Sequence, residues 1–187
     1  MKAIRRKLAF AQAVALALVL GACGGDDGPN CTQNPTAAEC PPTPPPPEVR
    51  TLILEGSFSG LGEMVLASVP FNTNATGRIE VTVDWTFASD DVDIYLVHGS
   101  CTIEQFNADT CSFVTFSESF TAKPESISAG NQAAGFYNLY IGNRGPAEES
   151  VSFQIFQVTG GSASSASTSH ANRAERAADF VGIVSRH

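Results

Sequence analysis

The chain has 187 residues, enough for roughly one folded domain once its irregular ends are set aside. It carries 19 acidic against 11 basic side chains, a formal net charge of −8. Nucleic-acid binding is disfavoured, because its affinity comes largely from basic side chains that displace counterions, and no basic stripe is visible. The acidity instead favours solubility.

The N-terminus predicts export. Four basic residues within the first seven precede an apolar run over residues 8–20, which contains no acidic residue and is shorter than a membrane span. The run ends in Leu20-Gly21-Ala22-Cys23, which resembles the bacterial lipobox. The resemblance implies that residues 1–22 are a signal peptide and that the Cys23 thiol takes a diacylglyceryl group, so that acyl chains such as palmitate hold the protein to a membrane. Because Gly24 follows, it also implies the outer membrane of a Gram-negative cell. The alternative is an ordinary signal peptide whose cleavage site includes a cysteine.

Residues 23–48 predict a lipidated, disordered tether. Without the signal peptide, 165 residues remain, with 7 basic and 19 acidic side chains and a net charge of −12. The tether begins Gly-rich and ends in the proline run of residues 41–47, which favours an extended path of about 3 Å per residue. It therefore predicts a stalk that spaces the domain from the membrane. A proline-rich ligand for a recognition domain is the alternative.

Four further cysteines make an even set, which in an exported protein predicts two disulfides. Three pairings are open, and the shortest loops favour Cys31 with Cys40 and Cys101 with Cys111. Zinc is the alternative, but eight and nine residues separate the cysteines of these pairs, without the close spacing that zinc ligands usually show.

Residues 49–159 predict an all-β domain. Short segments with period-two alternation are separated by Gly, Asn, Asp and Pro, and no segment keeps a helical period. The clearest strand, Arg78–Trp85, has its large apolar residues on one face. The expected strands cover residues 52–55, 64–71, 78–85, 92–97, 112–120, 136–141 and 151–158. About seven or eight such strands favour an antiparallel β-sandwich.

Residues 160–187 predict a disordered tail. Residues 160–170 are a low-complexity linker rich in Gly, Ser and Ala. Ala171–Val184 has a weak apolar face that allows a short helix, which in isolation is marginal in water.

Two patches resemble the bacterial pre-peptidase C-terminal domain. They are Asp90–Val97, similar to its acidic residue followed by a strand, and Gly135–Ile141, similar to its Gly-x-Tyr strand. The resemblance implies a jelly-roll-like sandwich that serves as an accessory or binding module. The chain departs from the usual context, because no protease domain accompanies the sandwich and Cys101 and Cys111 add a loop.

An acidic turn is the sharpest candidate for chemistry. Asp84, Asp90, Asp91 and Asp93 lie close together between two expected strands, and calcium takes hard oxygen ligands. The sequence therefore makes Asp90, Asp91 and Asp93 a candidate calcium site, although the spacing lacks the glycine and closing glutamate of an EF-hand. The alternative is that these carboxylates bond backbone amides in the turn. No other cofactor is expected.

No catalytic set is visible. His98 is the single histidine within residues 49–159, and no Gly-x-Ser-x-Gly motif accompanies it. Glu148 and Glu149 are adjacent, so on a strand they point to opposite faces and cannot flank one glycosidic bond. The sequence predicts a non-enzyme.

The expected function is therefore a membrane-tethered binding or scaffolding module whose partner is an envelope protein or a glycan. The alternative is a carbohydrate-binding or accessory module of a hydrolase system. Exposed Tyr95, Tyr137 and Tyr140 would stack on sugar rings, whereas buried tyrosines with bonded hydroxyls would argue against that role.

Overall fold

A computed structural model describes residues 44–120, 122–161 and 179–186. The predicted signal peptide, the lipidation site Cys23 and the Cys31–Cys40 pair lie outside these residues. Within them, no helix is long and apolar enough to cross a membrane.

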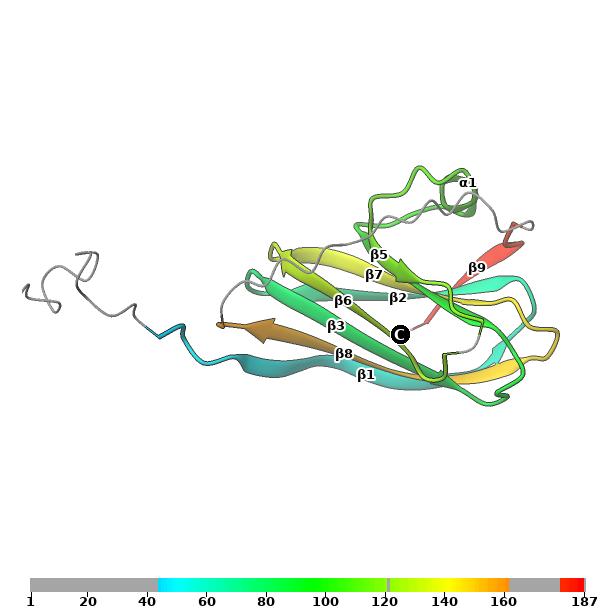
Figure 1. The fold of residues 1–187 in the computed structure, drawn as a ribbon. Helices are drawn as coiled ribbons and strands as arrows, with labels where there is room; N and C mark the ends of the chain where they lie inside the picture. Colours follow the sequence, from blue (N-terminus) through cyan, green and yellow to red (C-terminus); the bar gives the residue numbers. More distant parts are fainter. Residues whose placement is uncertain (1–43, 121, 162–178, 187) are drawn as a thin grey trace, which may run out of the picture. The chain divides into compact units, whose positions relative to one another are not determined.

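The described residues form two packed sheets (Figure 1). The four-stranded sheet has the order β1-β8-β3-β6, and the five-stranded sheet has the order β5-β4-β7-β2-β9. Neighbouring strands run antiparallel, except that β9 runs parallel to β2. The predicted all-β sandwich is thus confirmed. The strands are β1 (Val49–Leu61), β2 (Val65–Thr73), β3 (Gly77–Trp85), β4 (Val92–His98), β5 (Phe113–Ser117), β6 (Glu125–Gln132), β7 (Gly135–Asn143), β8 (Glu149–Thr159) and β9 (Gly182–Ser185).

The core lies between the sheets and follows the period-two pattern. On β3, Val81, Val83 and Trp85 face inward and are buried, while the residues between them face solvent. Ile94 and Leu96 of β4 belong to the same core. Each such aliphatic side chain contributes about 1.5–3 kcal/mol when it is fully buried.

A second apolar cluster covers the outer face of the five-stranded sheet. Because β4 is buried on both faces, Tyr95 and Val97 point outward into this cluster. A short helix, α1 (Ile103–Asn107), lies over it and contributes Phe106. The predicted Cys101–Cys111 disulfide is confirmed, and it closes the loop that carries α1.

The two ends of the sandwich differ in what they carry. Val49 of β1 pairs with Thr159 of β8, so the chain enters and β8 ends at the same end of the four-stranded sheet. We call this the entry end. The opposite, distal end carries the β1–β2, β3–β4 and β7–β8 connections and the start of β6.

Three elements differ from the sequence-based expectation. The strand β6 went unpredicted, because within its Ser- and Gly-rich sequence Ile127 is the single large apolar side chain. The helix α1 is too short to show a period. At the end of the chain, the short helix that the sequence allows over Ala171–Val184 is wrong for residues 182–184, which belong to β9, and the tail expected from residue 160 includes this ordered strand. Ile183 and Val184 are β-branched, and the edge of β2 supplies backbone partners that an isolated segment lacks.

Candidate functional site

A groove crosses the outer face of the four-stranded sheet. It consists of two adjoining hollows of about 560 Å³ and 400 Å³, both bordered by Ser57, Asp84 and Ser152. These sizes lie in the range of small-molecule sites. The first hollow is also lined by Glu55, Gly56, Thr82, Pro124, Phe153 and Gln154, and the second by Phe58, Ser59, Trp85, Thr86, Ser150 and Val151.

Small residues on neighbouring strands leave this groove open. Ser57 of β1 lies beside Ser152 of β8, and Ser152 lies beside Asp84 of β3. One residue earlier on β1, Gly56 lies opposite Phe153, and a Cβ on this glycine would come 2.9 Å from the Phe153 ring. The glycine therefore lets the ring fill the space beneath β1, and short side chains cover it from outside.

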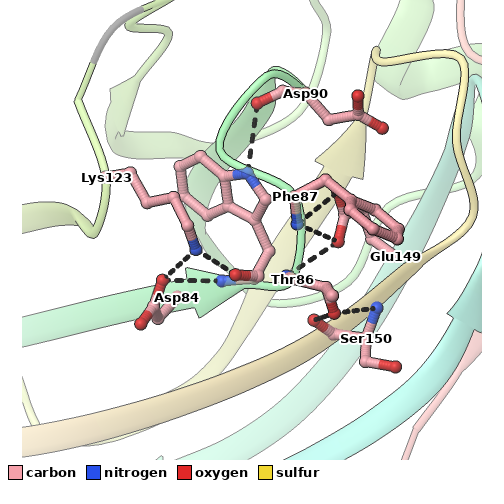
Figure 2. A network of polar contacts seen from close by, with 8 residues as sticks. Asp84, Thr86, Phe87, Asp90, Lys123, Glu149 and Ser150 are labelled. Carbon is pink, nitrogen blue, oxygen red and sulfur yellow. Dashed lines mark hydrogen bonds and ion pairs between the residues drawn. The ribbon is translucent and has the colours of Figure 1, made fainter.

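Carboxylates give the groove its charge. Lys123 Nζ donates to Asp84 Oδ1 and to the Trp85 carbonyl oxygen, and it lies 4.7 Å from the centroid of the Trp85 ring (Figure 2). The hydrogen bond from Lys123 lowers the pKa of Asp84, so this carboxyl is ionised at neutral pH. On the other side, Glu55 accepts a hydrogen bond of 3.3 Å from the Gln154 amide. The groove thus presents oxygen acceptors, hydroxyls and one amide.

Buried Glu149 shapes the turn beside the groove. Its carboxylate accepts hydrogen bonds from the backbone N–H groups of Thr86 (2.8 Å) and Phe87 (3.1 Å), as Figure 2 shows. The indole N–H of Trp85 donates to the Asp90 carbonyl oxygen at 3.1 Å. Glu149 is buried and Glu148 is exposed. As expected from their adjacency, these two carboxylates do not face one another, and Glu149 has a structural role.

The three aspartates of the candidate calcium site bind different protein groups. Asp90 Oδ2 accepts from the backbone N–H of Ala147 at 3.0 Å. Asp93, fully buried, accepts from Arg144 Nε at 2.6 Å and from the Tyr95 hydroxyl at 3.0 Å. The carbonyl oxygen of Asp91 accepts from the Arg144 N–H at 2.8 Å.

These contacts match the alternative, that the aspartates hold the turn together. Among the residues that the structure describes, no set of three His, Cys, Asp or Glu side chains is arranged to hold a metal ion. Calcium binding at Asp90, Asp91 and Asp93 stays a prediction, which melting experiments test.

A second buried acid, Glu125, lies at the start of β6. It is fully buried, and its Oε1 accepts from the Ser119 N–H at 2.7 Å, while Oε2 has no hydrogen-bond partner among the described residues. Burial, together with the nearby negative charges of Asp93 and Asp91, raises the pKa of Glu125 to about 7. No local sequence pattern marks Glu125, because the carboxylates near it, Asp91 and Asp93, come from a distant part of the chain.

The remaining candidate residues have structural surroundings. His98 is exposed, and its ring meets Tyr137 edge-on at 5.1 Å between centroids. Tyr95, Tyr137 and Tyr140 are buried, which matches the alternative of core tyrosines and argues against their stacking on sugar rings. Their hydroxyls are bonded instead; that of Tyr140, for example, accepts from the Cys101 N–H at 2.9 Å.

Comparisons with known proteins give no family. No protein-family profile and no curated protein matches the sequence. Among solved structures, the chain is similar to the C-terminal domain of A223, a structural protein of Sulfolobus turreted icosahedral virus, at 15% identity over 58% of this chain and 98% of that one, with a TM-score of 0.33. It is also similar to a Yersinia pseudotuberculosis-derived mitogen, at 12% identity over 66% of this chain and 93% of that one, with a TM-score of 0.35. Likenesses this weak leave the resemblance to the pre-peptidase C-terminal domain a prediction.

Proposed function

We propose that this protein is an exported, lipid-anchored and non-catalytic binding module of the cell envelope, which takes its partner in the groove over β1, β8 and β3. The groove is the observation that carries the binding role, because two adjoining shallow hollows on one sheet face are lined by polar groups from three strands. The lipobox-like sequence at Cys23 and the proline-rich tether support the anchor.

The chemistry of the groove favours a neutral, hydroxyl-rich ligand such as a glycan. Carboxylates and amides accept and donate hydrogen bonds to sugar hydroxyls, and Glu55, Asp84 and Gln154 supply these groups. Glu55 disfavours an anionic ligand beside it, whereas Lys123 offsets the charge of Asp84.

The anchor is tested in cells that grow with radiolabelled palmitate. The wild-type protein should take up label and fractionate with membranes, whereas Cys23→Ser should do neither. A Cys31→Ser variant is the matched control and should behave like the wild type. Label and membrane association that persist in Cys23→Ser would show that the anchor assignment is wrong.

The groove is tested by filling it. Ser152 lies between both hollows, so Ser152→Tyr should abolish binding to a neutral-glycan array and to immobilised envelope extract. Ser128→Tyr is the matched control, because Ser128 is exposed on the neighbouring β6 and lines neither hollow. Binding that survives in Ser152→Tyr, or is lost equally in both variants, would contradict a binding role of this groove.

The non-enzyme assignment is tested with chromogenic esters and glycosides. We expect no turnover above background from the purified protein. Turnover that survives purification and disappears in His98→Ala would overturn the assignment.

A further inference from the structure

The segment Asp179–Arg186 lies on the five-stranded sheet as a peptide lies in a recognition groove. Its strand β9, red in Figure 1, adds to the edge of β2 with Ser185 beside Ser68. Just before the strand, the Val181 N–H donates to the Met64 carbonyl oxygen at 2.8 Å. Addition of an extended strand to a sheet edge is a common mode of peptide recognition.

One aromatic side chain anchors the segment. Phe180 is only 2% exposed, and its ring meets Tyr95 and Phe106 edge-on at 6.3 and 5.8 Å between centroids. Gly142 makes room for it, since a Cβ there would lie 2.4 Å from the ring. The Arg144 guanidinium covers the ring at 4.3 Å from its centroid. These residues form a pocket fitted to an aromatic ring.

A side chain of α1 also binds the backbone of the segment. Asn107 Oδ1 accepts from the Phe180 N–H at 3.2 Å, and Asn107 Nδ2 donates to the Phe180 carbonyl oxygen at 2.8 Å. One amide thus satisfies both main-chain groups of the anchor residue, as a neighbouring strand would. Together, the β2 edge, the aromatic pocket and this amide recognise an extended chain.

The connection between β8 and β9 is long enough for the C-terminal segment to bind either its own molecule or another copy. β8 ends at the entry end, whereas β9 begins beside Val65 at the distal end. The nine residues of β2 span about 30 Å at roughly 3.3 Å per residue. The 17 residues 162–178 can reach at most about 56–61 Å. This reach exceeds the length of the sheet, so the covalent chain does not oblige the segment to bind its own molecule.

We propose that the β2 edge and the Phe180 pocket form a strand-addition site through which copies of this chain exchange their C-terminal segments, residues 179–186 of one molecule binding the groove of another. Exchange of an identical element between copies is a low-cost route to association. A covalent connection of 17 residues gives the segment an effective concentration of order mM at its own groove. Self-binding therefore dominates in micromolar solution, and exchange becomes comparable where local concentrations approach mM.

Disulfide trapping between two full-length variants tests the exchange. Ser68 and Ser185 are direct neighbours across the β2–β9 pair, at the spacing of adjacent strands that a disulfide can bridge. A Ser68→Cys chain labelled with 15N is mixed with an unlabelled Ser185→Cys chain under mild oxidation. We expect a covalent heterodimer linked between positions 68 and 185, identified by mass spectrometry, with a yield that rises with concentration. A single chain carrying both changes should close on itself and serves as the geometric control.

Substitution of the anchor residue Phe180 tests whether the cross-link depends on the proposed pocket. When Phe180→Ala is added to the Ser185→Cys chain, the heterodimer yield should fall at least tenfold, while Val181→Ala, a change at a 74% exposed neighbour, should leave it unchanged. The proposal is overturned if the double variant closes on itself but the mixed chains give no cross-link up to millimolar concentration. It is equally overturned if Phe180→Ala has no effect, or if the double variant does not close.

Discussion

The outer faces of the two sheets differ, because one is exposed and the other is covered by further segments. The outer face of the four-stranded sheet is open and polar, with hydroxyls and carboxylates around a groove. The outer face of the five-stranded sheet is covered by α1, the Cys101–Cys111 loop and the C-terminal segment, over a cluster of aromatic side chains. A strand with alternating residues can serve only one core, whereas β4, apolar along most of its length, serves two. The uncovered sheet is the one that carries the groove in which we propose that a partner binds.

The largest loss of stability is expected from a substitution in the aromatic cluster on the covered face. Phe106→Ala removes a fully buried ring that contacts Tyr95, Phe113 and Phe180, and it should cost about 3–5 kcal/mol of unfolding free energy. Chemical denaturation measures this cost. Phe87→Ala is the control, since Phe87 is half-exposed, and it should cost much less. Equal losses would mean that the outer cluster is no second core.

The next effect depends on pH. Because the pKa of Glu125 is about 7 in the folded protein and 4.5 for an unperturbed glutamate, the folded state binds the proton more tightly than the unfolded chain does. Stability from this group is fully present below about pH 4.5 and is lost as the pH rises through about 7, by roughly 3 kcal/mol. Glu125→Gln should remove this loss between pH 4.5 and 8, whereas Glu148→Gln, at an exposed site, should retain it. Identical pH profiles for Glu125→Gln and the wild type would contradict the assignment.

The next prediction concerns calcium binding at the β3–β4 connection, which lies at the distal end of the sandwich. If calcium binds the folded domain at Asp90, Asp91 and Asp93, the melting temperature should rise with its concentration, with a gain of about 2.7 kcal/mol at a hundredfold excess over Kd. Magnesium should stabilise less. Asp91→Asn and Asp93→Asn should abolish the shift. Superimposable melts in EDTA and in millimolar calcium would leave these carboxylates as parts of the fold alone.

Loss of the disulfide should weaken only the covered face. Cys101→Ser with Cys111→Ser opens a loop of sequence separation 10, which should cost about 2–3 kcal/mol. The sandwich should still fold, and hydrogen exchange should accelerate in α1 more than in β3 or β8. Global unfolding on reduction, or faster exchange throughout both sheets, would show that the loop supports the main core as well.

The smallest effect on stability is expected in the open groove. Ser152→Ala changes an exposed hydroxyl, so the free energy of unfolding should stay within about 0.5 kcal/mol of the wild type. Ligand binding should weaken instead. A melt that drops by several degrees would indicate that the groove is a structural part of the sheet.

The sequence predicted what local pattern determines. Arg78–Trp85 alternates strictly, so its strand and its buried face were both foreseeable. β6 and β9 were not, because their side chains are small or few and long-range backbone partners stabilise them. For the site, sequence placed Asp84 and the aspartates in a turn, but the Lys123 contact, the anchoring by Glu149 and the charge of Asp93 near Glu125 join residues 32 to 63 positions apart. A local sequence pattern does not reveal contacts between residues so far apart in the chain.

The pairing of β1 with β8 has a mechanical consequence. The chain enters at Val49, and the β1–β8 ladder runs from there to Leu61 at the distal end. A partner held in the groove would pull on the middle and distal parts of this sheet, while an anchor before Val49 would pull the other way along β1. Because antiparallel hydrogen bonds lie perpendicular to the strands, such a force loads the bonds together in shear instead of opening them one at a time. The edge strand β1 is thus oriented to carry tension if the proposed tether holds the chain before Val49.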